Sequence, residues 1–395
     1  MKFLLYLPLD DRTHVSGPVA DALNIAQSFA SAKIPSILIF NGQPELFRLF
    51  EQTGIDVRRM EMPVSSVKRH FDPRYRHRYS VEIADFVKRE QIDVLYLLDN
   101  APYLLNYVKN LDLLRVCTQI GGAPNPKPIR LFEKGIEVNP KVVAKAWYRK
   151  YVRLNYRKAD LVVCLSEAAR ETALHTYGVS PEKAKTVFPG VTKRASKSNP
   201  GAIRQEFGIA DQEKLILSVG RITKAKGIEE LGEIARILSE RGKSYRILFA
   251  GRERDQVYGR MIREKYGNYI TFIGQRTDLA TAYADADLLV HTSHREAGPL
   301  VIIEAMEFGV PSIAWDIPGC NELVVDGQTG SLLRFGDLEG FADSIETLLE
   351  QHDLYKEAST AANDRFSRFS VDDYAPRIVS AVDDHLAERP VANRR

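Results

Sequence analysis

One segment of the chain joins a strand, a polar loop and a helix, and from Leu288 to Glu307 it reads LLVHTSHREAGPLVIIEAME. The apolar run at 288–291 predicts a buried strand, and the apolar residues of 300–308 predict a helix. Ligands of parallel α/β sheets bind beyond the carboxyl ends of the strands. The loop between the two elements, which contains Glu296, is therefore a candidate binding site.

Two carboxylates stand eight residues apart in this segment, Glu296 in the loop and Glu304 inside the helix. A carboxylate can accept paired hydrogen bonds from neighbouring hydroxyls, so two of them suit a polyol ligand such as a sugar joined to a ribose. The helix around Glu304 is apolar on nearly every side, so its carboxylate needs a partner. Gly298, at the helix entrance, lets a ligand approach the backbone closely.

A second cluster, at 218–227, reads SVGRITKAKG. A strand ends at Gly220, and Arg221 and Lys226 flank a turn that leads into a helix. Two cations near a helix N-terminus favour an anionic ligand, because the helix adds free N–H groups and a positive dipole. Taken alone, the same residues also fit a solvated basic turn.

The same alternation of short apolar runs and helical patterns extends along the whole chain and predicts an α/β fold with parallel sheets covered on both faces. The expected strands are 2–7, 36–40, 94–98, 114–118, 161–165, 186–188, 214–219, 245–250, 269–273, 288–291, 311–314 and 330–333. The expected helices are 18–32, 44–52, 79–90, 139–157, 223–242, 254–266, 278–284, 300–308, 337–351 and 371–387. A polar stretch rich in Pro, Gly and Ser, at 189–201, predicts a linker between two doubly wound sheets that face a cleft.

The composition, 44% hydrophobic and 27% charged over 395 residues, indicates two or three globular domains and excludes a disordered chain. Residues 1–190 hold 28 of the 55 Lys and Arg against 20 of the 52 Asp and Glu, so the first half is basic and the second acidic. Cys117, Cys164 and Cys320 are isolated, so no zinc site is expected. Without a signal peptide or transmembrane pattern, we expect a cytoplasmic protein.

Together these motifs resemble those of retaining, GT-B-fold nucleotide-sugar glycosyltransferases of family four, the glycosyl transferases group 1. The resemblance rests on motifs that stand in the family's order over about 215–349: Gly220-Arg221…Lys226-Gly227, the Glu296…Glu304 pair, Glu304-Ala305-Met306, Gly309-Val310-Pro311, Pro318-Gly319 and Asp326-Gly327-Gln328-Thr329-Gly330. It implies two Rossmann-like domains, an acceptor-side domain at 1–192 and a donor-binding domain at 193–368. The helix within 369–395 is expected to cross back to the first domain.

The resemblance also assigns roles to single residues. Arg221 and Lys226 would bind the donor diphosphate, and Glu296 would contact the donor sugar; these three form the expected catalytic set. Glu304 would bind the ribose. The remaining donor-binding residues would be Gly17, Gly220, Gln275, Arg276, Thr277, Gly298, Pro299 and Leu300, with the loop at 275–277 near the base. That loop equally fits a plain strand–helix connection. Members of the family need neither a metal nor a cofactor, so none is expected.

The chain departs from the family pattern at four places. In the first loop, where Gly-Gly is usual, the chain has His14-Val15-Ser16-Gly17-Pro18. Gly298 stands where an aromatic residue is usual, Pro189 stands where Asn is common, and Gln119 stands where many members have His. On the acceptor side the candidates are Asp11, His14, Asn100 and Gln119, which follow strand ends and also fit turn capping.

The expected reaction moves a sugar from a nucleotide-diphosphate sugar to a hydroxyl of a glycan, glycolipid or lipid-linked acceptor, in surface polysaccharide or glycoconjugate synthesis. The alternatives are an inactive binding or scaffold subunit and a sugar phosphorylase or epimerase on the same fold. Basic residues at 58–78 and 141–158 are interleaved with aromatic residues, a pattern that suits binding to an anionic membrane surface. The protein is therefore expected to be peripheral on the inner face of the plasma membrane. A packed amphipathic helix fits 141–158 equally well. No nucleic-acid motif accompanies the charge.

Overall fold

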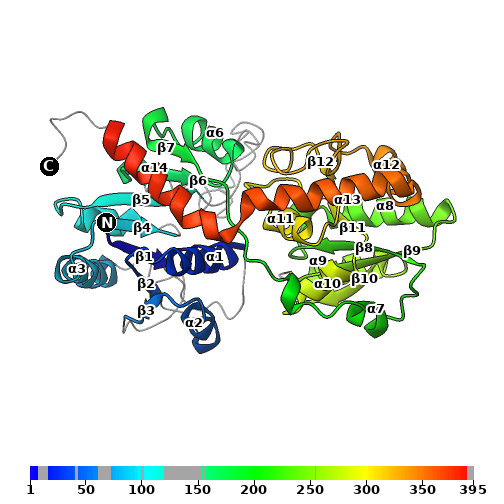
Figure 1. The fold of residues 1–395 in the computed structure, drawn as a ribbon, viewed down its shortest axis with the longest axis horizontal. Helices are drawn as coiled ribbons and strands as arrows, with labels where there is room; N and C mark the ends of the chain where they lie inside the picture. The colour runs from blue at the N-terminus through cyan, green and yellow to red at the C-terminus, as the bar shows by residue number, and fades with distance from the viewer. Residues whose placement is uncertain are drawn as a thin grey trace, which may run out of the picture. The chain divides into compact units, whose positions relative to one another are not determined.

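The computed structural model describes residues 1–7, 17–40, 43–60, 73–98, 102–119, 153–154, 156–253 and 255–388. The chain divides into two compact units (Figure 1). The first unit combines Met1–Gly190 with Val371–Arg395, and the second is Val191–Ser370.

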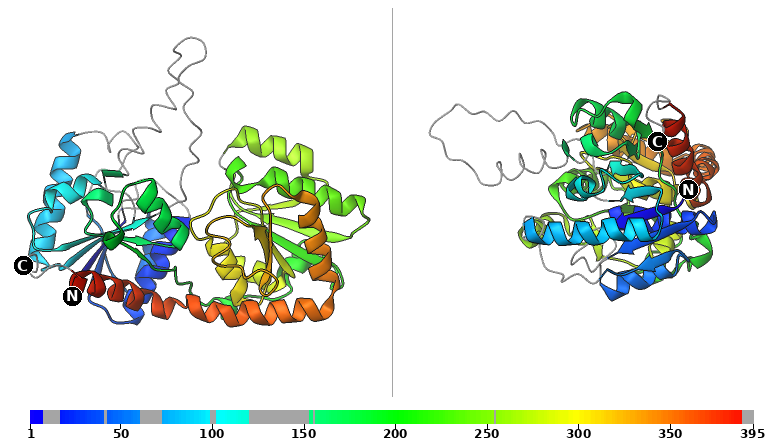
Figure 2. Two further views of the ribbon diagram at one scale, coloured as in Figure 1. Left: turned by 90° about the horizontal axis from the view of Figure 1, so that it is seen from above. Right: turned by 90° about the vertical axis from the view of Figure 1, so that its left-hand side faces the viewer.

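The first unit is built on a parallel sheet of seven strands, in the order β3-β2-β1-β4-β5-β6-β7. Its strands are β1 (Phe3–Leu7), β2 (Ser36–Phe40), β3 (Asp56–Arg58), β4 (Val94–Leu97), β5 (Leu114–Gln119), β6 (Leu161–Cys164) and β7 (Ala184–Thr186). The central strands are buried along their whole length, because helices cover both faces of the sheet (Figure 2).

The helices of the first unit include one from the end of the chain. Among the described residues they are α1 (Gly17–Ser31), α2 (Pro44–Glu51), α3 (Pro73–Arg89), α4 (Pro102–Tyr107), α6 (Glu167–His175) and α14 (Tyr374–Glu388). Helix α14 packs beside α1, where the Tyr374 hydroxyl donates to the Asp21 carboxylate at 2.9 Å. Tyr374 and Ile378 belong to the same buried core as the sheet, so the tail helix is part of the first unit.

The second unit has a parallel sheet of six strands, in the order β10-β9-β8-β11-β12-β13. Its strands are β8 (Lys214–Val219), β9 (Tyr245–Ala250), β10 (Thr271–Gly274), β11 (Leu288–His291), β12 (Ser312–Trp315) and β13 (Gly330–Leu333). Its helices are α7 (Ala202–Glu206), α8 (Ile228–Glu240), α9 (Gln256–Tyr266), α10 (Leu279–Asp285), α11 (Leu300–Glu307), α12 (Leu338–Glu350) and α13 (His352–Phe366). Val191 N–H donates to the Phe369 carbonyl at 2.8 Å, so the two ends of this unit lie side by side.

The structure confirms the α/β class and corrects several elements. Five of the described elements were not expected: strand β3 and helices α4, α6, α7 and α13. Strand β7 begins two residues before the expected strand, and α3 begins at Pro73 rather than at residue 79. Helix α8 begins only at Ile228, because Gly227 adopts a left-handed conformation with φ of +63°. The helix expected at 139–157 lies outside the described residues apart from its last turn.

Within the described ranges, no helix combines the length and the apolar character needed to cross a membrane.

Candidate functional site

Two loops of the second unit, those after β8 and β11, are bonded to each other at the carboxyl end of the sheet. The Thr292 hydroxyl donates to the Lys226 carbonyl at 3.3 Å, and His294 N–H donates to the Ala225 carbonyl at 3.0 Å. Gly227 makes this approach possible: a Cβ on it would lie 1.8 Å from the Thr292 carbonyl oxygen. The contact places Lys226 next to Glu296, the cation and the carboxylate that the sequence motifs predict for the binding site.

Lys226 and Glu296 form a close ion pair, with 2.6 Å between Lys226 Nζ and Glu296 Oε1. The Nε2 atom of His291, from the end of β11, lies 2.9 Å from the same oxygen. Burial raises the pKa of the Glu296 carboxyl, but the bond to His291 and the positive charge of Lys226 outweigh it and hold that pKa well below its usual range. Glu296 is therefore ionised at neutral pH.

Glu304 has the partners that its apolar helix requires. Tyr283, from α10, donates its hydroxyl to Glu304 Oε2 at 2.9 Å, and the guanidinium of Arg194 donates to Oε1. Burial lowers the pKa of Arg194, but the charges of Glu304 and Glu307 reverse the effect, so the guanidinium stays protonated. Arg194 lies in the predicted linker, and no sequence motif pointed to it or to Tyr283.

The linker is also bound to α11 through its backbone. The N–H groups of Arg194 and Ala195 both donate to Glu307 Oε1, the second of these at 2.6 Å. Glu307 follows Glu304 by one helical turn, so one face of α11 holds the linker with two carboxylates.

Other expected donor-site residues belong to the same two loops or to the start of α11. Gly220 follows β8, where a Cβ would lie 3.6 Å from the Lys226 side chain, and the exposed Arg221 comes next. Pro299 precedes the first residue of α11, Leu300, and Gly298 is half-buried in the loop before them. The absence of a side chain at Gly220 leaves the Lys226 side chain room on this side.

The loop expected near the base, at 275–277, lies between β10 and α10. Gln275 and Thr277 are exposed. The Arg276 guanidinium is held by two carboxylates, at 2.7 and 2.8 Å from Glu206 and at 2.7 and 2.8 Å from Asp278. Because these bonds occupy the guanidinium, the groups that this loop offers a ligand are those of its backbone and its two exposed side chains.

The acceptor-side candidates belong to the first unit. Asp11, His14 and Asn100 lie outside the described residues. Gly17 is the first residue of α1, and Gln119 is the last residue of β5, at the carboxyl end of the first sheet. Their relation to the second unit stays a prediction.

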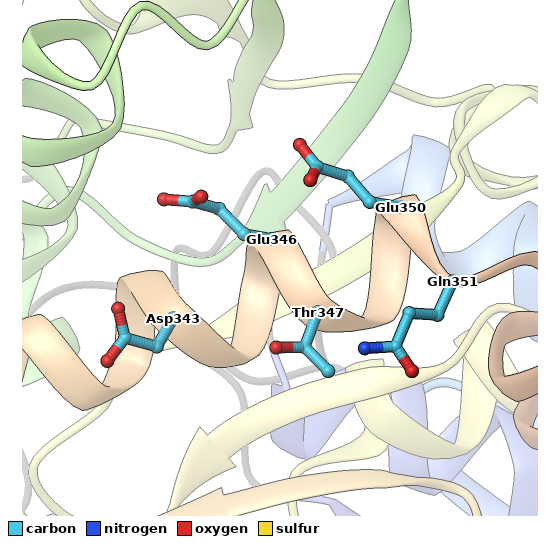
Figure 3. A pocket seen from close by; sticks show the side chains of 5 residues that line it. All are labelled: Asp343, Glu346, Thr347, Glu350 and Gln351. Atoms are coloured by element: carbon cyan, nitrogen blue, oxygen red, sulfur yellow. The ribbon is translucent and has the colours of Figure 1, made fainter.

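A surface pocket along α12 is separate from these motifs. Figure 3 shows its lining side chains, which include Asp343, Glu346 and Glu350. Arg241, at the end of α8, donates to Asp343 and Glu346 at 2.7 Å each, and Lys243 pairs with Glu350. The acidic side chains are therefore compensated by two cations of the protein. Within the part of the chain that the structure describes, no three His, Cys, Asp or Glu residues gather as a metal site would require.

Two protein-family models match the chain. The model described as Glycosyltransferase Family 4 matches residues 15–193, and the model described as Glycosyl transferases group 1 matches residues 201–365. N-acetyl-alpha-D-glucosaminyl L-malate synthase of Bacillus anthracis is 27% identical over 217 residues, which are 54% of this chain and 56% of that protein. The chain thus spans about half the length of this curated relative.

Solved structures share the fold over nearly the whole chain. HepE of Anabaena in complex with UDP has a TM-score of 0.75 at 21% identity, covering 97% of this chain and 100% of that one. The same protein is also known in complex with UDP-glucose. WaaG, a glycosyltransferase involved in lipopolysaccharide biosynthesis, has a TM-score of 0.69 at 19% identity, covering 96% of this chain and 98% of that one.

Proposed function

Because the chain belongs to the family four type of GT-B glycosyltransferases, we propose that it transfers a sugar, with retention of configuration, from a nucleotide-diphosphate sugar to an acceptor hydroxyl. One observation carries the proposal. The Lys226–Glu296 pair lies at the carboxyl end of the second sheet, and Glu304 follows on the adjoining helix. A cation for phosphate and two carboxylates for hydroxyls match the three parts of such a donor.

Breaking the bond between sugar and phosphate puts negative charge on the departing diphosphate. Lys226 and Arg221 stabilise that charge, since preorganised cations act most strongly where charge develops. Glu296 binds hydroxyls of the transferred sugar and Glu304 binds the ribose. The acceptor attacks on the leaving-group side, and the departing phosphate takes its proton. With two protein cations at the diphosphate, the reaction needs neither a metal nor a cofactor.

The relatives support a choice of donor and acceptor class to test first. HepE binds UDP and UDP-glucose, which supports a uridine nucleotide as the first donor to test. WaaG takes part in lipopolysaccharide biosynthesis, which supports a glycan, glycolipid or lipid-linked acceptor in surface polysaccharide or glycoconjugate synthesis.

We place the protein in the cytoplasm, where its three buried thiols would stay reduced. It would contact the inner face of the plasma membrane through the basic segments 58–78 and 141–158. Residues 61–72 and 120–152 lie outside the described residues, so the support for this contact is the sequence together with the exposed Arg78 on α3.

The test is a panel of UDP- and GDP-sugars, read first by thermal stabilisation and then by sugar transfer. A true donor raises the melting temperature, because it binds only the folded chain. A true donor is also hydrolysed slowly when no acceptor is present. In the transfer product, NMR should show the same anomeric configuration as in the donor, as retention requires. Donor binding without hydrolysis or transfer would instead indicate an inactive binding subunit. Transfer that EDTA abolishes would contradict the metal-independent mechanism.

A further inference from the structure

His291 is a buried polar residue at the end of an apolar strand, and the proposed reaction gives it no task. Its side chain is 3% exposed, and its Nε2 atom lies 2.9 Å from Glu296 Oε1. Lys226 Nζ approaches the same oxygen, at 2.6 Å. One oxygen of the Glu296 carboxylate thus has two partners. One is the imidazole ring of His291, and the other is the ammonium group of Lys226.

These two partners differ in how firmly they are held. His291 pairs with Ala314 of β12 in the sheet, and the carbonyl of the next residue, Thr292, accepts a bond from Trp315 Nε1 at 3.1 Å. Lys226 instead reaches Glu296 from a short turn through four methylene groups. The histidine is fixed by the sheet, whereas the ammonium can turn to another anion.

The difference between the fixed His291 ring and the mobile Lys226 ammonium matters when a donor diphosphate binds. When Lys226 turns toward the phosphates, Glu296 loses an ion-pair partner although its side chain is only 12% exposed. Removing one partner from a buried charge is strongly unfavourable unless another group compensates it. Without His291, diphosphate binding would have to overcome that cost.

We propose that His291 is a positioning residue that holds the Glu296 carboxylate through Nε2–H, so that Lys226 is free to bind the donor diphosphate. The inference rests on the proposed function, which assigns Lys226 to the diphosphate. The neutral ring suffices, because its Nε2–H tautomer can donate the bond. The same bond keeps the orientation of Glu296 fixed for the sugar that arrives with the diphosphate.

The test uses UDP and GDP, which carry the diphosphate but no sugar, with binding measured by calorimetry. We expect His291→Leu, which fits an apolar strand but cannot donate, to bind the preferred nucleotide about 10- to 100-fold more weakly than the wild type. His291→Gln, whose amide can donate, recovers part of the affinity. Glu296→Gln removes the charge that needs a partner, so the double variant H291L/E296Q binds as well as E296Q alone.

The double variant separates positioning from general support of the fold. If H291L binds nucleotide like the wild type, or if H291L/E296Q binds more weakly than E296Q alone, the proposal is overturned. Melting temperatures without nucleotide show whether each variant folds, and His291→Met replaces the leucine variant if that one does not. A wild-type protein that binds neither UDP nor GDP would overturn the proposed function itself, whereas normal binding by both wild type and H291L would overturn only the role of His291.

Discussion

The guanidinium of Arg194 donates to the carboxylate of Glu304, although the two residues lie 110 positions apart in the chain. Tyr283 completes the group from α10, and the backbone of Arg194 is bound to Glu307 one turn further along α11. The segment that follows the boundary between the two units is therefore attached to the helix that carries the proposed ribose carboxylate.

Replacing Arg194 by alanine should destabilise the second unit and weaken nucleotide binding. Glu304 would keep Tyr283 but lose its cation while remaining mostly buried. Because the Arg194 side chain is partly exposed, we expect a loss of about 1–3 kcal/mol in the free energy of unfolding. Arg194→Lys should lose less, because it keeps the charge. Urea denaturation and UDP calorimetry measure the two effects. The exposed neighbour Lys193 is the control, and a loss in Lys193→Ala as large as in R194A would contradict the assignment.

Gly227 and Gly242 offer a matched pair of substitutions. Both have left-handed backbones, with φ of +63° and +74°, but a Cβ on Gly227 would collide with the Thr292 carbonyl, whereas a Cβ on Gly242 has no atom within 4 Å. Alanine at Gly242 should therefore cost only the backbone strain, about 1–2 kcal/mol. Alanine at Gly227 should cost more and also separate the two loops that hold Lys226 and Glu296. Equal stability and equal nucleotide binding in the two variants would contradict this account.

The alternation of apolar runs was enough to predict the fold class and most strands. Strand β3 was missed because Asp-Val-Arg at 56–58 is short, polar and paired only with β2 at the sheet edge. Helix α13 was missed because its buried face consists of Ala358, Ala362 and Phe366, and alanines give a weak apolar pattern. Both elements depend on tertiary packing more than on local hydrophobicity.

The site was predictable where the motifs are local. Lys226, Glu296 and Glu304 were named from their spacing, and the apolar surroundings of Glu304 indicated that it needs a partner. The partner itself was not predictable, since Arg194 lies in a polar stretch that reads as a linker. His291 stood inside the quoted motif, but its place at the end of an apolar run indicated only a strand.

Removing the cations assigned to the diphosphate should reduce turnover far more than it reduces stability. We expect Lys226→Ala and Arg221→Ala each to lower the rate of sugar transfer by roughly 100-fold or more, as for other preorganised charge-stabilising groups. Steady-state kinetics with the donor found in the panel measure the effect. Lys224→Ala, an exposed lysine in the same turn, should retain near-normal turnover. Near-wild-type rates in both K226A and R221A would refute the site assignment.

The basic segments should direct the protein to anionic membranes. We expect co-sedimentation with vesicles rich in phosphatidylglycerol or phosphatidylserine at low salt, and its loss as ionic strength rises, because screening shortens the range of surface charge. Neutral phosphatidylcholine vesicles are the control. A protein that stays in the supernatant with anionic vesicles at low salt would end the membrane proposal.

Asp21 should make the stability of the first unit depend on pH. Burial raises the pKa of its carboxyl to about 7, although the hydrogen bond from Tyr374 acts in the opposite direction. The folded chain then binds this proton more tightly than the unfolded chain. The contribution of the protonated Asp21 carboxyl to the free energy of unfolding is therefore fully present below about pH 4. It is lost as the pH rises toward 7, and the loss is on the order of a few kcal/mol.

The variant Asp21→Asn removes this dependence, because an amide cannot ionise but can still accept the hydrogen bond from Tyr374. We expect it to match the wild type near pH 4 and to exceed it in free energy of unfolding at pH 8, as measured by urea denaturation across that range. Asp85→Asn, at an exposed position on α3, should keep the wild-type pH profile. If Asp21→Asn also loses stability with the wild-type slope between pH 4 and 7, a different group is responsible for that slope.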